Sequence, residues 1–402
     1  MASPASSLRG IIVAVLALLA APIGLVDSRT PAARQGIPHT DAVTGILEIL
    51  DSVPLVAIGD IHSVSEQGEF YQRLIRHPRL PDRVDDLILE LGNELYQGVA
   101  DRYVSGQSVP LDSLRMIWEN TTQGPLITAT APMYTSLFDA VREVNASLPP
   151  ARRVRILLGD PAVEWQTVTR DELWEIHKRR GDRMRELARD SVIAKGRRGI
   201  IIAGFRHLIR RPARDGTDMK WGDLSSKVFV VRPHNGFGGT AARHEAAIDS
   251  LPPGSLIRLR DSFIGDLESD EVDMATSGSG SRQPVPAGMK SANAGMKMKE
   301  TADGYLYIGP FTTFTYSAPD VERVRKDPSR LAAIHTMACT MMGRPRDTVA
   351  LFRVPSKLLY PSGKRPAQLD LEPVNERSAA MPPVPANLPE PCASLLRARN
   401  AG

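Results

Sequence analysis

The sequence predicts an α/β fold, with a largely parallel or mixed central sheet flanked by helices. Two observations lead to this prediction. Short apolar runs of strand length alternate with longer segments whose apolar residues recur at helical spacing. Turn residues follow each of the first four runs, as is typical of strands that are buried on both faces. These four runs cover residues 55–58, 86–92, 154–158 and 199–203.

Amphipathic patterns between these runs complete the alternation. Helices are expected over 40–52 and 64–77, each with apolar residues on one face. Three further patterns between the second and third strands predict a helical insertion, and a long helix precedes the fourth strand. The remaining predicted helices cover 93–104, 110–120, 131–147, about 170–195 and 319–342, and the remaining strands cover 228–232, 255–260 and 305–308.

The N-terminal residues have the features of a secretory signal. Arg9 precedes an apolar run from Ile11 to Val26, and small residues follow. The run is shorter than the roughly 20 apolar residues of a membrane span, and Pro22 and Gly24 interrupt it. We therefore expect an exported protein, periplasmic or secreted, with an uncleaved anchor as the alternative. No transmembrane domain is expected beyond this segment.

The rest of the chain is expected to form one α/β domain with two irregular regions. Residues from about 267 to 302 are rich in Gly, Ser, Met and Lys and predict a mobile insertion. The C-terminal region is rich in Pro, Ala and Arg, which predicts disorder. The expected organisation is a signal peptide at 1–28, a linker at 29–39, the α/β domain at 40–360 and a Pro-rich tail at 361–402.

The composition is that of a globular protein and argues against nucleic-acid binding. The net charge of +4 arises from 50 basic and 46 acidic residues, and no block of one sign stands out. Short Arg pairs at 152–153, 179–180 and 197–198 are interpreted as solvated helix faces, because a nucleic-acid footprint needs a basic stripe with interleaved aromatic residues. Cys339 and Cys392 could form a disulfide or remain two buried thiols.

Two Gly-x-x-His motifs follow predicted strands, at Gly59–His62 and Gly204–His207. Glycine permits a tight exit from a strand or a close backbone approach, and the histidine then stands just above the sheet edge. Ligands of open α/β sheets bind beyond the carboxyl ends of the strands. We therefore expect both imidazoles to point to one place, with Glu90 supplying a carboxylate from a third strand. Two histidines and a carboxylate are common in metal sites and in acid–base sites.

Each of these residues also has a structural interpretation. His62 and His207 could be turn residues that cap the following helices. Glu90 would be partly buried, and a buried carboxylate is unfavourable unless it is paired. A salt bridge to Arg180 or Arg183 is therefore an alternative to catalysis.

Three other residues are secondary candidates. Asp160 could contribute to the site or could cap a helix that begins at Pro161. Glu94 and His234 could approach the same sheet edge. The sequence contains no Gly-x-Ser-x-Gly elbow, no His-Glu-x-x-His motif and no Walker phosphate loop, so an ordinary serine hydrolase is not expected.

Taken together, the two motifs resemble the superfamily that joins the TraB and Tiki proteins, the ChaN-like haem-binding proteins and the erythromycin esterases. Glu90 matches the family's acidic strand end, and 180–184 is similar to its Arg-x-x-x-Met segment, with Arg180 better placed than Arg183. Asp60 stands where esterase-like and ChaN-like members usually have Glu. The resemblance covers 50–210 well and 211–345 weakly.

The resemblance implies a hydrolase that cleaves an ester, a lactone or a peptide bond. Its catalytic residues would be Asp60, His62, Glu90, Arg180 and His207. His62, Glu90 and His207 could hold a divalent metal ion that lowers the pKa of bound water. Arg180 would then meet the developing negative charge.

The ChaN-like members imply a second function, the binding of haem. Haem iron takes an axial His or Tyr in a pocket with apolar walls. His62 and His207 would then be cofactor-binding residues, and Tyr96 and Tyr103 are further candidates. A third alternative is a member that keeps the fold without an activity.

Overall fold

The computed structural model describes the chain in several stretches, and all of them except Gly36 belong to the unit Ile37–Gly402. The predicted signal at 1–28 and most of the predicted linker lie outside the described residues. Among the residues that are described, no helix is long and apolar enough to span a membrane. The described residues are 36–124, 132–210, 218–237, 239–269, 295–315, 317 and 320–343, with the backbone of 353–355 and 371–373.

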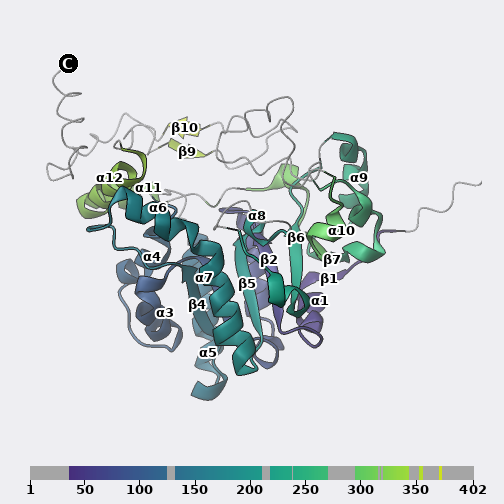
Figure 1. Cartoon of the computed structure of the whole chain (residues 1–402), viewed down its shortest axis with the longest axis horizontal. Coiled ribbons are helices and arrows are strands. Elements are labelled where there is room, and N and C mark those ends of the chain that lie inside the picture. The colour runs from purple at the N-terminus through teal and green to yellow at the C-terminus, as the bar shows by residue number, and fades with distance from the viewer. Residues whose placement is uncertain are drawn as a thin grey trace, which may run out of the picture. The chain divides into compact units, whose positions relative to one another are not determined.

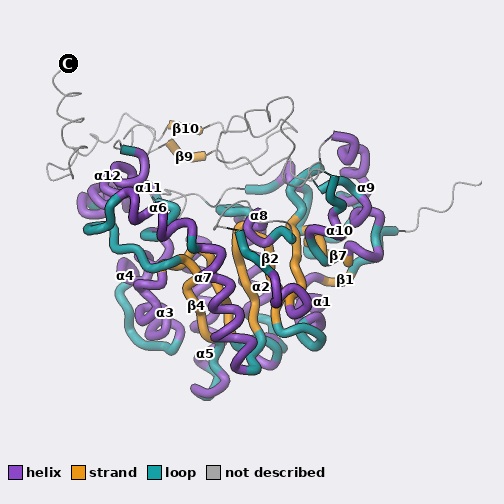
Figure 2. The backbone as a smooth tube through the Cα atoms, viewed as in Figure 1, coloured by secondary structure: helices purple, strands orange, loops and turns teal. Residues whose placement is uncertain are grey.

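An eight-stranded, mainly parallel sheet forms the centre of this unit (Figures 1 and 2). In order across the sheet, the strands are β1 (Thr40–Asp41), β7 (Ser255–Arg258), β8 (Gly304–Tyr307), β6 (Val228–Pro233), β2 (Leu55–Asp60), β5 (Gly199–Gly204), β3 (Asp86–Asn93) and β4 (Arg155–Asp160). The six strands from β8 to β4 are parallel, whereas β7 is antiparallel to both β8 and β1. The predicted α/β fold class is therefore confirmed.

Alternate residues of each strand enter two separate cores, one on each face of the sheet. Val56 and Ile58 join the first core, while Leu55 and Ala57 join the second. Burial on both faces explains why the central strands are continuous apolar runs. The first core is covered by α1 (Ala42–Ile49), α2 (Ser65–Ile75), α3 (Gln97–Val104), α4 (Leu111–Glu119) and α5 (Pro132–Ala146), and the second by α7 (Arg180–Glu186), α8 (Phe205–Leu208), α9 (Glu245–Ile248) and α10 (Met298–Thr301).

Two of the predicted helices are broken into shorter pieces. The long helix over 170–195 consists of α6 (Arg170–Lys178), α7, a π-helical turn and a 3-10 turn, and Gly196 ends it with a φ of 64°. The last helix consists of α11 (Val321–Lys326) and α12 (Pro328–Met342). Pro328 has no amide proton to continue a helix, and Asp327 instead caps a new one.

Both ends of the segment predicted as a mobile insertion are structured. Glu268 pairs with Lys297 in an isolated antiparallel bridge, and α10 follows. Residues 270–294 between them lie outside the described residues, as does most of the predicted tail. Within the tail, β10 (Leu371–Pro373) pairs with β9 (Arg353–Pro355).

Cys339 is buried in α12 and takes part in a disulfide. This outcome excludes a free thiol at that position. Cys392, the other cysteine of the chain, lies outside the described residues.

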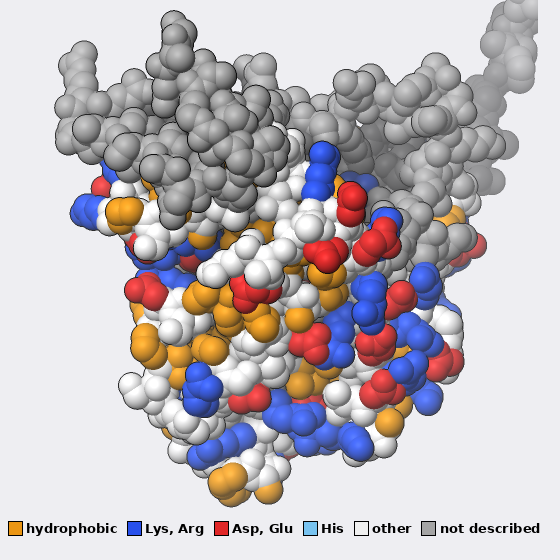
Figure 3. All heavy atoms as spheres, turned by 60° about the vertical axis from the view of Figure 1, so that its left-hand side comes forward, with side chains coloured by type: hydrophobic (Ala, Val, Ile, Leu, Met, Phe, Trp, Pro, Cys, Tyr) orange, Lys and Arg blue, Asp and Glu red, His pale blue; other side chains and the backbone are white. Residues whose placement is uncertain are grey.

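Charged side chains of both signs are interspersed on the face of the molecule in Figure 3. Arg152 and Arg179 have exposed side chains, as the interpretation of the Arg pairs as solvated faces requires. For two other members the interpretation is wrong, because Arg180 is buried and Arg197 forms an ion pair with the buried carboxylate of Asp86. These two guanidiniums are part of the fold.

Candidate functional site

The carboxyl ends of β2 and β5 bring the two Gly-x-x-His motifs together. Parallel pairing places Gly59 beside Ala203 and Asp60 beside Gly204. The strand that carries Glu90, β3, pairs with the other edge of β5. Segments about 145 residues apart in the chain thus end side by side at one edge of the sheet, as expected for a ligand site of an open α/β sheet.

Both imidazoles approach the carboxylate of Glu90, as the motif spacing predicts. His62 Nε2 lies 4.0 Å from Glu90 Oε2, and His207 Nε2 lies 3.4 Å from Glu90 Oε1. The His62 side chain is 37% exposed and the His207 side chain is 19% exposed, whereas Glu90 is 1% exposed. Two accessible rings therefore flank one buried carboxylate.

The glycines of the motifs are required by close packing, not by an unusual backbone conformation. A Cβ at Gly204 would lie 3.1 Å from His62 Nε2, 3.2 Å from Glu90 Oε2 and 3.4 Å from His207 Cδ2. A Cβ at Gly59 would collide with the Cβ of Phe205. The absence of a side chain at Gly204 therefore leaves space for the side chains of His62, Glu90 and His207. The absence of a side chain at Gly59 leaves space for Phe205 of the second motif.

Glu90 accepts several hydrogen bonds, which stabilise its ionised carboxylate. Its donors are the Arg180 guanidinium, the Gly204 amide and Gln123 Nε2, the last at 3.0 Å. Burial alone would raise the pKa of Glu90, but Arg180, the two histidines and the Gly204 amide lower it to about 2. Glu90 is therefore ionised at neutral pH. Its predicted pairing with Arg180 is present, which agrees with the structural interpretation of this residue.

Asp160 completes the buried ion-pair network. Its Oδ1 lies 3.2 Å from Arg180 Nε, and the Thr122 amide and hydroxyl each donate to it at 2.6 Å. Burial raises the pKa of Asp160 to about 7 although Arg180 and Thr122 oppose the change, and the charge of Glu90 adds to the rise. No helix begins at Pro161, so the alternative of a helix cap at Asp160 is wrong.

His62 is held by Asp60, which is its near neighbour in the chain. Asp60 Oδ2 lies 2.6 Å from His62 Nδ1, and the Tyr71 hydroxyl donates to Asp60 Oδ1 at 3.1 Å. Burial lowers the pKa of His62, but the hydrogen bond and charge of Asp60, together with the charge of Glu90, outweigh it and raise the pKa to about 9. An imidazolium–carboxylate pair therefore forms at neutral pH. The shorter side chain of Asp60 does not prevent this contact.

The pKa of His207 is shifted in the opposite direction from that of His62. Burial lowers its pKa, and this effect exceeds the opposing influence of Glu90 and of Asp218, whose Oδ1 lies 3.8 Å from His207 Nδ1. At neutral pH the His207 ring is therefore uncharged. One carboxylate thus has a charged imidazole on one side and a neutral imidazole on the other.

An apolar pocket opens beside His62. Its walls come from α2, α5, β3 and β5 and include Leu89, Met133, Leu137 and Phe138. Asp60, His62 and Glu90 line the same pocket. Polar groups at the edge of an apolar pocket are typical of small-molecule sites.

The secondary candidates lie elsewhere. Glu94 Oε1 is 2.7 Å from Arg183 Nη2, and its side chain is 38% exposed. His234 follows β6 and its Nε2 is 2.7 Å from Glu245 Oε1. Each of the two therefore pairs with a residue outside the two Gly-x-x-His motifs.

Both tyrosines named for haem have other partners. Asn120 Nδ2 donates to the Tyr96 hydroxyl at 3.1 Å, and the Tyr103 hydroxyl donates to Asp139. Haem binding therefore stays a prediction, without a contact that supports it.

The group that could hold a metal ion, among the residues described, is not the predicted one. It consists of His234, Glu245 and Asp249, whose potential ligand atoms lie within 4.8 Å of one another. His62, Glu90 and His207 do not form such a group among the described residues, and Glu90 already accepts a hydrogen bond from the Arg180 guanidinium. A metal ion bound by the two motifs stays a prediction.

Sequence reasoning missed the residues that support the site. Gln67 and Tyr71 are four residues apart on α2 and thus on one helix face, where Gln67 Nε2 donates to the Tyr71 hydroxyl at 2.7 Å. Their position on the helix after the first motif could have suggested them. Thr122 and Gln123 lie in a loop whose contacts with β3 and β4 leave no local signal.

Comparisons with known proteins do not assign the chain to a family. No protein-family model and no curated protein matches it. Two solved structures are similar to part of it. The type III effector HopBA1 has a TM-score of 0.32 and 14% identity over 51% of this chain and 88% of its own. A protein from Bacillus cereus has a TM-score of 0.36 and 9% identity over 55% of this chain and 80% of its own. The family resemblance of the motifs therefore stays a prediction.

Proposed function

We propose that this chain is a hydrolase in which His62 and His207 act as acid and base on an ester, lactone or peptide bond. The observation that carries the proposal is the unequal environment of the two rings beside Glu90. Asp60 holds a proton on His62, whose pKa is about 9, while burial lowers the pKa of His207. A ring that can donate a proton and a ring that can accept one are the groups that carbonyl hydrolysis requires.

The proposed reaction uses one water molecule. His207 takes a proton from this water as its oxygen bonds to the carbonyl carbon. The charged His62 ring stabilises the resulting oxyanion and then donates its proton to the leaving oxygen or nitrogen as that bond breaks. Proton exchange with solvent restores both rings.

Glu90 and Arg180 are positioning residues in this scheme. Arg180 is 3% exposed, and both its Nη2 and its Nε face carboxylates. It therefore stabilises the charge of Glu90, and Glu90 in turn orients the two rings. This role replaces the contact with the substrate that the family resemblance implies for Arg180.

The pocket supports a substrate with an apolar group next to the cleaved bond. Leu89, Leu137 and Phe138 would contact that group, because they line the cavity onto which His62 opens. The resemblance of the two motifs to the erythromycin-esterase and Tiki proteins supports the same reaction class. Export to the periplasm or the medium is part of the proposal.

The test is hydrolysis of chromogenic esters, lactones and peptides that carry small and medium apolar groups. His62→Ala and His207→Ala should each lower kcat/KM by on the order of 100-fold or more. His39→Ala is the matched control, because His39 is exposed and its ring contacts only a backbone carbonyl in the described structure. Activity of the wild type should fall at acid pH, below the ordinary imidazole pKa, as His207 gains a proton, and above about pH 9 as His62 loses one.

Two results would contradict the proposal. One is a folded wild-type protein with no activity on any of the three substrate classes. The other is an activity that survives both histidine replacements. Activity that a chelator removes and a divalent ion restores would instead support the metal-dependent version of the site, and a Soret band in the purified protein would support haem binding.

A further inference from the structure

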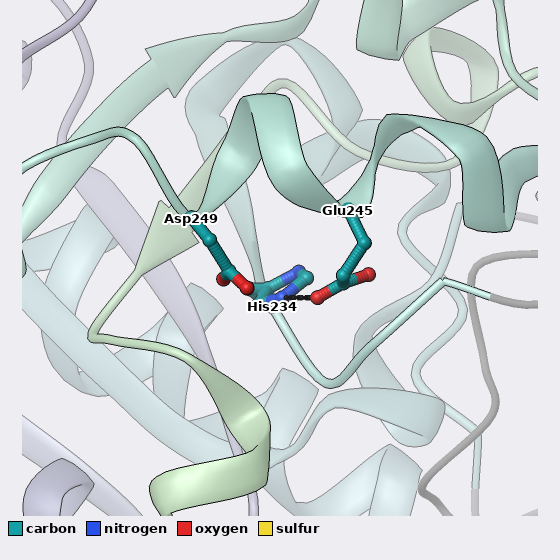
Figure 4. Close-up of side chains that lie close together, drawn as sticks. All are labelled: His234, Glu245 and Asp249. Atoms are coloured by element: carbon teal, nitrogen blue, oxygen red, sulfur yellow. Dashed lines mark hydrogen bonds and ion pairs between the residues drawn. The ribbon is translucent and has the colours of Figure 1, made fainter. Parts of the chain in front are cut away.

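A second cluster of ionisable side chains lies at the border of the second core, beside Phe237, Ile248 and Tyr305, and none of its members lines the pocket beside His62. His234 is fully buried just after β6, Glu245 is the first residue of α9 and Asp249 directly follows α9. A potential ligand atom from each of the three lies within 4.8 Å of the other two. Figure 4 shows Glu245 and Asp249 extending from one helical turn toward the His234 ring.

Helix geometry explains why the two carboxylates converge. Glu245 and Asp249 are four residues apart, and the Asp249 amide donates to the Glu245 carbonyl oxygen at 2.8 Å. Residues at this spacing lie on the same side of a helix. Burial together with the charge of Glu245 raises the pKa of Asp249, as expected where two carboxylates share one site.

Each of the three side chains also forms a hydrogen bond with a neighbouring residue outside the cluster. Hydrogen bonds of this kind orient the ligands of metal centres and leave their other atoms directed at the ion. His234 Nδ1 is 2.8 Å from the Tyr305 hydroxyl, Glu245 Oε2 accepts from the Phe237 amide at 2.8 Å, and Asp249 Oδ1 accepts from the Tyr307 hydroxyl at 3.1 Å.

We propose that His234, Glu245 and Asp249 bind one divalent transition-metal ion, and that Zn²⁺ is the ion that fits best. Three nitrogen and oxygen ligands from the protein, with a fourth position left to water, are a coordination that Zn²⁺ adopts in proteins. Asp249 is exposed, so solvent can reach the cluster. Mg²⁺ and Ca²⁺ prefer sites made only of oxygen atoms and fit less well.

Binding would replace a hydrogen bond with two metal–ligand bonds. His234 Nε2 now lies 2.7 Å from Glu245 Oε1, a contact that requires a shared proton. When the ion binds, the shared proton leaves Nε2, either to solvent or to Nδ1 of the ring, and Nε2 becomes a ligand. The ring then carries its proton on Nδ1, which donates to the Tyr305 hydroxyl. The bound ion would link α9 to the end of β6 and, through the Tyr307 hydroxyl, to β8. We therefore assign the site a stabilising role in this part of the fold.

The test is calorimetric titration of Zn²⁺ and Mg²⁺ into metal-free protein prepared without a histidine tag. We expect one Zn²⁺ per chain, and at least tenfold weaker binding in Glu245→Gln and in Asp249→Asn. These variants keep the size of the side chain, and circular dichroism would show that they are folded. Glu175→Gln is the matched control, since Glu175 is an exposed carboxylate on a helix, and it should bind Zn²⁺ as the wild type does.

A second variant separates this site from the two motifs. The double replacement His62→Ala with His207→Ala should leave Zn²⁺ binding unchanged, because neither residue belongs to the cluster. Loss of binding in that variant would overturn the assignment, and so would unchanged binding in both Glu245→Gln and Asp249→Asn. A wild-type chain that takes up no Zn²⁺, or that binds Mg²⁺ equally well, would overturn it as well.

Discussion

Replacing Glu90 with Gln would remove the charge at the centre of the candidate site while keeping the size of the side chain. Glu90 is 1% exposed, and its pKa is about 2 compared with an ordinary value of 4.5. That difference corresponds to a stabilisation on the order of 3 kcal/mol at neutral pH. Arg180 is the cation mainly responsible, since it donates directly to the carboxylate.

The Glu90→Gln variant will not lose all of this stabilisation, which is on the order of 3 kcal/mol. The Gln amide oxygen can still accept from Gly204, and Arg180 can then pair with Asp160 alone, which would lower the raised pKa of Asp160. We therefore expect Glu90→Gln to lower the free energy of unfolding at pH 7 by roughly 1–3 kcal/mol. Because the pKa of Glu90 is depressed in the folded state, its stabilisation is present above about pH 4.5 and is lost as the pH falls toward 2.

The assay is urea unfolding followed by tryptophan fluorescence at several pH values between about 3 and 7. The difference between the wild type and Glu90→Gln should shrink as the pH falls. Glu94→Gln is the control, because Glu94 is a more exposed carboxylate at the same end of β3, and it should change stability by less than about 1 kcal/mol. A difference for Glu90→Gln that is absent at pH 7, or that is as large at pH 3 as at pH 7, would refute the reasoning.

Four further substitutions test the site and the backbone beside it. In Asp60→Asn the pKa of His62 should fall from about 9, because only the charge of Glu90 then opposes burial, and a titration of the ring signals by nuclear magnetic resonance would measure it; an unchanged value would count against the pair. Gly59→Ala should lower the free energy of unfolding, measured in a urea melt, by about 2–4 kcal/mol. Gly204→Ala should lower this free energy less and should lower the rate of hydrolysis more. If the two variants lost equal stability and equal activity, the different roles of the two glycines would be contradicted. Ser63 has a φ of 67°, so Ser63→Gly should stabilise the chain by about 1 kcal/mol, and a lower melting temperature would show that its backbone is not strained.

The sheet could be predicted because its central strands are buried on both faces. Continuous apolar runs such as Leu55–Ile58 and Gly199–Ala203 are the direct result of two cores meeting at one strand. The direction of a strand has no such signature. The antiparallel pairing of β7 with β8 and β1 therefore could not be predicted from periodicity, nor could the break of the long helix before Arg180.

The positions of the main site residues could be predicted for a similar reason. Parallel strands end at the same edge of a sheet, so the sequence predicts that His62, Glu90 and His207 meet there. Their charges could not be predicted, since these depend on burial and on partners that are distant in sequence. Thr122 is one such partner, which reaches Asp160 only because the helical insertion folds back over β4.

The two motifs form one site because each makes room for the other. Gly59 of the first motif leaves the space that Phe205 of the second motif occupies, and Gly204 of the second leaves the space into which His62 of the first extends. The pairing of Asp60 with Gly204 fixes this exchange, since a slip of one residue would turn every side chain of β2 to the opposite face of the sheet. A single Gly-x-x-His turn would lack both the space and the second ring. The chemistry proposed for this chain therefore depends on the register of two neighbouring strands as much as on the histidines themselves.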